Sequence, residues 1–191
     1  KQRTATPHPQ HGMPDLTDIN TVPTNDDFVF RPLRKNSKGG FSGHVGLKNP
    51  ADGTSKDILI QTPKERAPWG LSSLTGDDGQ EKFSLDVAVS SPELLAWLAA
   101  LDGAILDAAV TNSVEWFGKQ LSSDVIKEFY RPILKQPRDP RYSPTLSLKI
   151  PSRGGKLDVE FWNDDPQPQS IQPAEVSAGC SAVSIIKPRG L

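Results

Sequence analysis

The segment KFSLDVAVSSPELLAWL, Lys82 to Leu98, decides the fold because it joins two kinds of periodicity. Apolar residues at 83, 85, 87 and 89 alternate with polar or small ones, which predicts a strand with one buried face. Ser91-Pro92-Glu93 then supplies a hydroxyl cap and a proline in the first helical turn. The residues that recur at helical spacing predict a core helix running to about Lys119: Leu94, Trp97, Leu98, Leu101, Ile105 and Ala108.

Short strands are expected on both sides of this segment. Before it, the candidates are Phe28 to Arg31, Gly39 to Lys48 and Ile58 to Ile60, with a hairpin turn at Asp52-Gly53. After it, a second helix is expected to begin at Ser122 or Ser123 and to end near Arg131, because Pro132 disfavours helical geometry there. Three more strand candidates follow at Thr145 to Ile150, Leu157 to Trp162 and Ala182 to Lys187.

This order of elements predicts a mainly β fold with an α insertion. Within that class we expect an OB-fold-like β-barrel with an inserted helical pair at about 91–135. Residues 28–191 are predicted to form a single domain. Residues 1–27 contain four prolines among polar residues, so a disordered or extended N-terminal arm is predicted there.

Charge is segregated along the chain although the net charge is only −1. Residues 31–66 carry eight Lys or Arg against three acids, and residues 114–150 carry seven against four. The intervening residues 69–113 carry one lysine against seven acids. If the fold brings the two basic blocks together, one face of the molecule would be positive. The alternative is that the charges are scattered over a solvated exterior.

The stretch from Val114 to Ile150 alternates aromatic rings with cations. Rings stack on bases and cations neutralise phosphates, so this pattern is typical of single-strand nucleic-acid binding with little base preference. Trp116 and Phe117 are neighbours on a predicted helix and diverge by about 100°, so one of them is expected in the core and the other at the surface. Trp97 is expected in the core.

The sequence lacks the motifs of common catalytic sites. It contains no phosphate-binding P-loop, no GxGxxG, no HExxH and no GxSxG, and we therefore expect no enzymatic activity and no cofactor. The single cysteine, Cys180, excludes a disulfide within the chain and a zinc site built from several thiolates. With no signal peptide or long apolar span recognised in the sequence, an intracellular location is expected, and a membrane is not expected as a partner.

Three segments carry a resemblance to a known family. They are ILIQTPKERAPWGL at 58–71, LDGAILDAAVTNSVEWFGKQLSSDVIKEFYRPILK at 101–135 and RYSPTLSLKI at 141–150. In pattern and order, over about residues 28–190, the chain resembles the single-stranded DNA-binding proteins of large nucleocytoplasmic DNA viruses and their protist relatives. That family is distantly similar to the phage T7 type of single-stranded DNA-binding protein. The resemblance implies an OB-fold that holds single-stranded DNA without catalysis during replication, recombination or repair, in the nucleus or at a viral replication site.

The candidate binding residues are exposed-looking rings and clustered cations. Trp69 lies in a Pro-Trp-Gly turn and Tyr142 in a basic, proline-rich loop, so these two rings are the stacking candidates. The phosphate candidates are Lys64, Arg66, Lys119, Arg131, Lys135, Arg138 and Arg141. No candidate catalytic residue or metal ligand emerges.

Single-stranded DNA is the predicted partner, and replication proteins are further candidates. RNA stays open as an alternative because no residue pattern reports on the 2′-hydroxyl, and a homo-oligomer also stays open. Two other functions compete with DNA binding. One is a structural or protein-docking module, and the other is a carbohydrate or small-molecule site with Trp69 and Trp162 as stacking rings.

Overall fold

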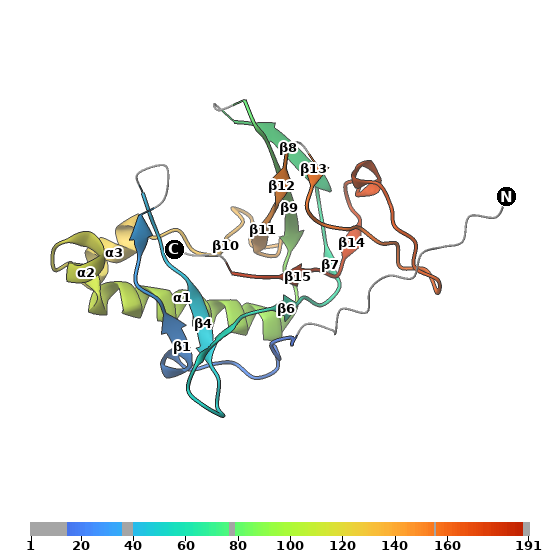
Figure 1. The fold of residues 1–191 in the computed structure, drawn as a ribbon. Helices are drawn as coiled ribbons and strands as arrows, with labels where there is room; N and C mark the ends of the chain where they lie inside the picture. Colours follow the sequence, from blue (N-terminus) through green and yellow to red (C-terminus); the bar gives the residue numbers. More distant parts are fainter. Residues whose placement is uncertain (1–14, 36–39, 77–78, 155, 189–191) are drawn as a thin grey trace.

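The computed structural model describes residues 15–35, 40–76, 79–154 and 156–188. Strands and short 3-10 turns dominate it, and three helices lie together in the middle of the chain (Figure 1). The helices are α1 (Pro92–Thr111), α2 (Ser113–Phe117) and α3 (Ser123–Phe129), and the 3-10 turns are η1 (Asn25–Asp27) and η2 (Pro173–Glu175). The strands are β1 (Phe28–Phe30), β2 (Arg34–Lys35), β3 (Phe41–Ser42), β4 (Val45–Lys48), β5 (Ser55–Asp57), β6 (Ile60–Gln61), β7 (Glu65–Arg66), β8 (Leu71–Thr75), β9 (Glu81–Ala88), β10 (Leu134–Lys135), β11 (Thr145–Ile150), β12 (Ser152–Arg153), β13 (Lys156–Leu157), β14 (Ser181–Ala182) and β15 (Ile185–Ile186).

Two larger sheets organise the strands. One has six strands in the order β10-β11-β9-β7-β14, with β8 also paired to β9. The other has three strands in the order β1-β4-β5, and three two-stranded pairs complete the pattern. All strand pairings in the described parts of the chain are antiparallel, and these parts contain no closed barrel. The fold is therefore mostly strands with a helical insertion between β9 and β10.

The predicted strand and helix of residues 82–98 are confirmed as β9 and the start of α1. Leu85, Val87 and Val89 are buried, as the alternation predicts. The Ser91 hydroxyl accepts a hydrogen bond from the backbone N–H of Leu94, and Pro92 is the first helical residue. Trp97 is fully buried and meets the Phe28 ring edge to face, with 5.9 Å between ring centroids. One core thus joins α1 to both larger sheets.

Helix α1 is also long and apolar enough to cross a membrane by length and composition, with a mean hydropathy of 1.6. No long apolar span was expected from the sequence, and this expectation was wrong for Pro92–Thr111. Its most apolar side chains, among them Leu94, Leu98 and Leu101, are buried in the core beside the sheets. A core helix of this kind satisfies the same hydropathy criterion as a membrane span.

The helical insertion differs from the expected pair. The first helix ends at Thr111 and not near Lys119, and a separate five-residue α2 follows. The Asn112 side chain and its backbone N–H both donate to the Ala108 carbonyl, at 2.8 and 2.9 Å, where the helix ends. Gly118 closes α2 with a left-handed φ of 73°. The second expected helix is α3, capped by Ser122 and ending at Phe129, two residues before the predicted end.

Several short strands also differ from their predicted bounds. The segment Ile58 to Ile60 contributes only its last residue to β6, because the Leu59 carbonyl accepts a hydrogen bond from Thr17 of the N-terminal arm. Of the predicted strand at residues 39–48, the described residues 40–48 contain two strands, β3 and β4, and Gly39 lies outside the described residues. Of the predicted strand at residues 157–162, only Leu157 belongs to a strand, β13. The predicted strand at residues 182–187 is divided between β14, which pairs with β7, and β15, which pairs with β6. The hairpin at Asp52-Gly53 is confirmed between β4 and β5.

The described part of the N-terminal arm, residues 15–27, lies against the domain. Asp15 forms an ion pair with Lys56 at 2.6 Å, and the Thr17 N–H donates to the Leu59 carbonyl at 2.6 Å. Ile19 packs against the core, and Asn25 donates to Asp107 of α1. This part of the arm contains a turn at residues 19–20 and ends in the 3-10 turn η1, while residues 1–14 of the predicted disordered or extended arm lie outside the described residues.

Candidate nucleic-acid interface

The register of the six-stranded sheet sorts its side chains onto two faces. Residues directly opposite one another in an antiparallel pair point to the same side, and residues two apart along a strand do so as well. Leu85 and Val87 of β9, with Leu146 and Leu148 of β11, therefore share the inner face that packs in the core. The opposite side, hereafter the outer face, is built from Arg66, Ser72, Leu74, Lys82, Ser84, Asp86, Ala88, Lys135, Thr145, Ser147, Lys149 and Ser181.

Four cations and one acid lie on the outer face. Lys135, Thr145, Ala88 and Arg66 form one row across β10, β11, β9 and β7. With strands about 4.8 Å apart, the row places Lys135 and Arg66 about 14 Å from one another at the backbone. Lys149 and Lys82 follow further along the sheet, and all four cationic side chains are exposed. The outer face can therefore attract a polyanion.

Arg66 is held in place by its neighbour Glu65. Glu65 points to the inner side and is 1 % exposed. Its carboxylate accepts hydrogen bonds from the Ser90 N–H at 3.0 Å, the Ser90 hydroxyl at 2.7 Å and the Ser91 N–H at 3.0 Å. These contacts tie β7 to the junction between β9 and α1. The buried carboxylate thus fixes the short strand from which Arg66 projects outward.

The turn that carries Trp69 is rigid and exposed. Ala67 and Leu71 are bonded through their backbones to residues 176–180, with Leu71 donating to the Val176 carbonyl at 2.9 Å. Gly70 adopts a φ of 66°, and a Cβ there would lie 2.5 Å from the Val176 carbonyl oxygen, so only glycine fits. The Trp69 side chain is 61 % exposed. The structure therefore presents this ring to solvent from a fixed backbone.

The basic loop between β10 and β11 lies at the other end of the row, next to Lys135. Arg141 pairs with Asp139 within the loop, with 2.6 Å between Nη2 and Oδ2. This hydrogen bond lowers the pKa of Asp139 and raises that of Arg141. Tyr142 is 68 % exposed, and Arg138 is exposed as well. The loop thus offers a second accessible ring and two cations, one of them already paired with a carboxylate.

The remaining predicted cations lie elsewhere. Lys64 precedes β7 and pairs with Asp164 at 2.6 Å, in a solvated contact that contributes little stability. Lys119 follows α2 and Arg131 follows α3, so both belong to the helical insertion and not to the sheet. Of the predicted site residues, the structure brings Arg66, Lys135 and the loop residues 138–142 to one sheet and its edge. It does not join Lys119 and Arg131 to them.

The other aromatic predictions concern burial. Trp116 is buried and Phe117 is 47 % exposed, so the expected division between core and surface is confirmed. The Trp116 ring contacts both Phe30 and Phe117 edge to face. The outer face itself carries no aromatic ring among the residues that the register assigns to it. The two predicted stacking rings, Trp69 and Tyr142, are exposed on the loops that follow β7 and β10.

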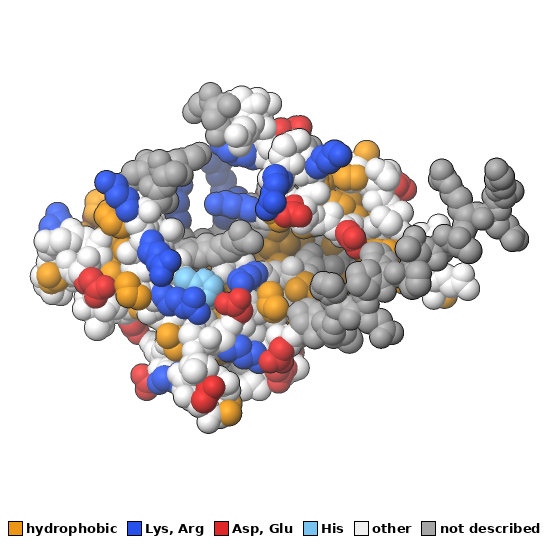
Figure 2. All heavy atoms as spheres, in the orientation of Figure 1, with side chains coloured by type: hydrophobic (Ala, Val, Ile, Leu, Met, Phe, Trp, Pro, Cys, Tyr) orange, Lys and Arg blue, Asp and Glu red, His pale blue; other side chains and the backbone are white. Residues whose placement is uncertain are grey.

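The surface view supports a clustering of positive charge. Lys and Arg side chains gather around a hollow near the middle of the face drawn in Figure 2. Acidic side chains are more frequent toward the lower part and the edges of the same view.

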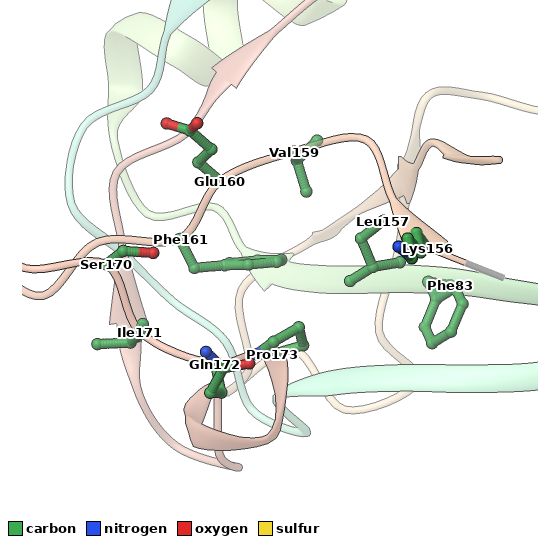
Figure 3. A pocket seen from close by; sticks show the side chains of 10 residues that line it. All are labelled: Phe83, Lys156, Leu157, Val159, Glu160, Phe161, Ser170, Ile171, Gln172 and Pro173. Carbon is green, nitrogen blue, oxygen red and sulfur yellow. The ribbon is translucent and has the colours of Figure 1, made fainter. Parts of the chain in front are cut away.

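A separate pocket of about 410 Å³ lies at the far end of the inner face. Leu157, Val159 and Phe161 alternate along one extended segment and turn into the pocket, whereas Glu160 turns away from it (Figure 3). Phe83 and Pro173 complete the apolar part of the wall. Neither Trp69 nor Trp162 lines this pocket, so the two rings proposed for a carbohydrate site do not meet there.

Three charged outer-face residues were not among the predicted site residues: Lys82, Asp86 and Lys149. The alternation along residues 82–89 places Lys82 and Asp86 on the polar side of the predicted strand, so the sequence alone could have indicated that they share a face. The position of Lys149 opposite Ser84 depends on the pairing of β11 with β9, which the sequence does not show. In the part of the chain that the structure describes, no three His, Cys, Asp or Glu side chains are grouped as a metal site would require.

Comparison with known proteins gives one match. Residues 77–139, from the turn before β9 to the loop after β10, match a model described as a family of unknown function (DUF5871). This match covers less than half of the chain. No curated protein and no solved structure matches the chain significantly.

Proposed function

We propose that this protein binds single-stranded DNA without catalysis and with little base preference along most of the strand. The observation that carries this proposal is the sheet register, which collects Arg66, Lys135 and Lys149 on one face. Two exposed rings, Trp69 and Tyr142, extend from loops next to that face. Cations and exposed rings together are what a sequence-tolerant single-strand site requires.

In this proposal, phosphates contact the cations of the outer face while unstacked bases lie against Trp69 and Tyr142. Each neutralised phosphate releases counterions, so affinity should fall steeply with salt. Arg141 can exchange the Asp139 carboxylate for a phosphate because the pair is exposed and its net contribution to stability is small. Paired bases in a duplex cannot offer their faces to Trp69 or Tyr142, so single strands should be preferred.

The finer fold assignment belongs to the same proposal. We infer that the strand-rich body is an open relative of the OB-fold, with α1 to α3 inserted between β9 and β10. The resemblance of three segments to viral and protist single-stranded DNA-binding proteins supports DNA as the ligand, with a role in replication, recombination or repair. RNA remains the alternative ligand, and the competition experiment below distinguishes the two.

The test is fluorescence anisotropy with a labelled single-stranded oligonucleotide at low and near-physiological salt. Duplex DNA and RNA of the same length serve as competitors. The double variant Arg66→Ala/Lys135→Ala removes two outer-face cations, and we expect it to weaken binding at least tenfold and to lower the salt slope by about 1.4. Binding of the wild-type protein should be strongest for the single strand.

A matched control removes the same net charge elsewhere. Lys48 on β4 and Lys127 on α3 are both exposed and lie outside the outer face. The variant Lys48→Ala/Lys127→Ala should bind nearly as well as the wild type. Equal losses in the two double variants would mean that only net charge matters, and no binding at low salt would refute the proposed function.

A second candidate function, a protein-docking module, is favoured by exposed apolar side chains on the short helices. Phe129 of α3 is 78 % exposed, and Val114 and Phe117 of α2 are 58 % and 47 % exposed. Such side chains are common at protein interfaces. If oligonucleotides do not bind, substitution of Phe129 and Phe117 by Ser, followed by interaction mapping with candidate replication proteins, tests this second function.

A further inference from the structure

Asp86 is the one carboxylate on the outer face, and it lies near the centre of that face. It belongs to β9, with Ser84 and Ala88 on either side along the strand and Ser147 directly opposite on β11. Its Oδ1 atom is shielded from solvent and, within the described chain, has no hydrogen-bond partner. A shielded carboxylate oxygen without a donor is costly, which makes this residue unusual among the acids of the protein.

The cations around Asp86 do not pair with it. Arg66 and Lys135 belong to the Ala88 row, and Lys149 belongs to the Ser84 row. Each of these rows lies about 7 Å from Asp86 along the strand. No ion pair joins Asp86 to a cation of the described residues. No cation of the described residues therefore competes with a ligand for this carboxylate.

The chemistry of that ligand follows from the charge. A carboxylate repels phosphate, so it does not serve the backbone of a nucleic acid. It accepts hydrogen bonds from the exocyclic amino groups of bases, and the amino group at N4 of cytosine is the established partner of Asp and Glu side chains. Thymine presents a carbonyl oxygen at the same position and would meet the carboxylate with repulsion.

We propose that Asp86 accepts a hydrogen bond from the exocyclic amino group of cytosine, so that one position of the bound strand discriminates cytosine from thymine. This inference rests on the proposed single-strand binding function. The phosphates on either side of that nucleotide would contact the two cationic rows. Rotation of the carboxyl group about its Cβ–Cγ bond, a broad torsion, exchanges the two oxygens, so the oxygen turned away from the shielded position would accept the hydrogen bond from the base.

The position of Asp86 suits discrimination because its backbone is rigid. Strand β9 is paired on both sides, with β11 along one edge and with β8 and β7 along the other. The inner-face neighbours Leu85 and Val87 are buried at 4 % and 1 % exposure. A hydrogen-bond acceptor on such a strand loses little freedom when it binds, unlike one on a loop.

The experiment compares oligo-dC with oligo-dT of equal length, by anisotropy at neutral pH and low salt. We expect the wild-type protein to bind oligo-dC roughly tenfold more tightly than oligo-dT. In Asp86→Asn, the amide can both donate and accept, so the preference should disappear. Affinity for oligo-dT should rise because a negative charge leaves the phosphate-binding face.

Glu81→Gln is the matched control. Glu81 is an exposed acid on the same strand, but its side chain lies on the opposite side from Asp86. This variant should retain the wild-type preference, and far-UV circular dichroism with thermal melts establishes that both variants are folded. Asp86→Ser provides a second variant that removes the charge with a smaller side chain.

The possible outcomes distinguish a failure of the inference about Asp86 from a failure of the proposed single-strand binding function. Equal binding of oligo-dC and oligo-dT by the wild type refutes the role of Asp86 but leaves single-strand binding intact. A preference that persists in both Asp86 variants refutes it as well. Failure of the wild type to bind either oligonucleotide refutes the proposed function, and the inference about Asp86 falls with it.

Discussion

Replacing Glu65 tests whether the buried carboxylate holds the sheet to the start of α1. Glu65→Ala removes the acceptor for two backbone N–H groups and one hydroxyl, those of Ser90 and Ser91. Hydrogen bonds to a charged acceptor contribute about 1.5–3 kcal/mol each. Because the variant also no longer buries a charge, we expect a net loss of about 4 kcal/mol in the free energy of unfolding.

Urea denaturation followed by tryptophan fluorescence measures this loss. With a slope of about 2–3 kcal/mol per molar urea, the midpoint should fall by about 1.5–2 M. Glu65→Gln keeps one acceptor oxygen but places an amide donor near the Ser90 and Ser91 donors, so about half the loss is expected. Glu81→Ala, at an exposed acid, should change stability by less than about 0.5 kcal/mol. A loss below about 1 kcal/mol for Glu65→Ala would refute the anchoring role.

Three further variants address the site and its supports. Gly70→Ala should destabilise the protein by about 2–3 kcal/mol in urea denaturation, because its Cβ would lie 2.5 Å from the Val176 carbonyl oxygen at a φ of 66°; an unchanged midpoint would contradict that geometry. Tyr130→Phe removes the hydrogen bond to Asp102 and should lower stability by about 1 kcal/mol. Burial is the main cause that raises the pKa of Tyr130 above its ordinary value of 10.0, and the hydrogen bond to Asp102 is the second cause. The contribution of the neutral Tyr130 to the free energy of unfolding is therefore present below about pH 10 and is lost at higher pH. Spectrophotometric titration should show one tyrosine that resists ionisation in the folded protein, and Tyr130→Phe should abolish that behaviour. Trp69→Ala should weaken oligonucleotide binding roughly tenfold in anisotropy. The salt slope should stay the same, since the substitution removes stacking and not charge. A full loss of salt dependence would contradict the role of Trp69 as a ring that stacks on a base.

Long periodic segments could be predicted from the sequence, and short pairings could not. The residues of β9 and β11 and the start of α1 follow from alternation, capping and helical spacing, and the structure confirms them, although α1 ends at Thr111 and not near Lys119. The segment Ile58 to Ile60 looks like a strand by composition, yet its middle carbonyl bonds to Thr17, more than 40 residues earlier. Such a partner leaves no local trace in the sequence. Two-residue strands such as β6, β14 and β15 are defined by their partners and not by their own residues.

The candidate site shows the same division. The predicted site combined residues 64–69 with the rings and cations of 114–150, and the cations of the second stretch are divided between the helical insertion and the sheet. Arg66 and Lys135 are 69 residues apart in the numbering, but the register sets them in one row. Asp86 was counted with the acidic block of residues 69–113, and that average hid its place on the cationic face. Long-range register is what the sequence alone lacks.

Strand β7 couples the stability of the fold to the proposed binding face, and a double-mutant cycle can detect this coupling. Glu65 and Arg66 are the two residues of β7. Glu65 is hydrogen-bonded on the inner side of the sheet, and Arg66 projects from the outer face. The pairing of β7 with β9 is limited to Arg66 opposite Ala88, and β7 pairs on its other edge with β14, so the Glu65 contacts are the main further link between β7 and the start of α1. Glu65→Gln should therefore weaken DNA binding although Glu65 lies off the outer face, by letting Arg66 move.

In the cycle, Arg66→Ala should cost several-fold in affinity when Glu65 is present and clearly less in the Glu65→Gln background, because the loosened arginine already contributes less. Both single variants should lower the salt slope by up to about 0.7, the contribution of one phosphate contact on a single strand. Affinity measured well below the unfolding midpoint of each variant separates this effect from loss of folded protein. Strictly additive losses would mean that Glu65 stabilises the fold without positioning Arg66, and the coupling through β7 would have to be abandoned.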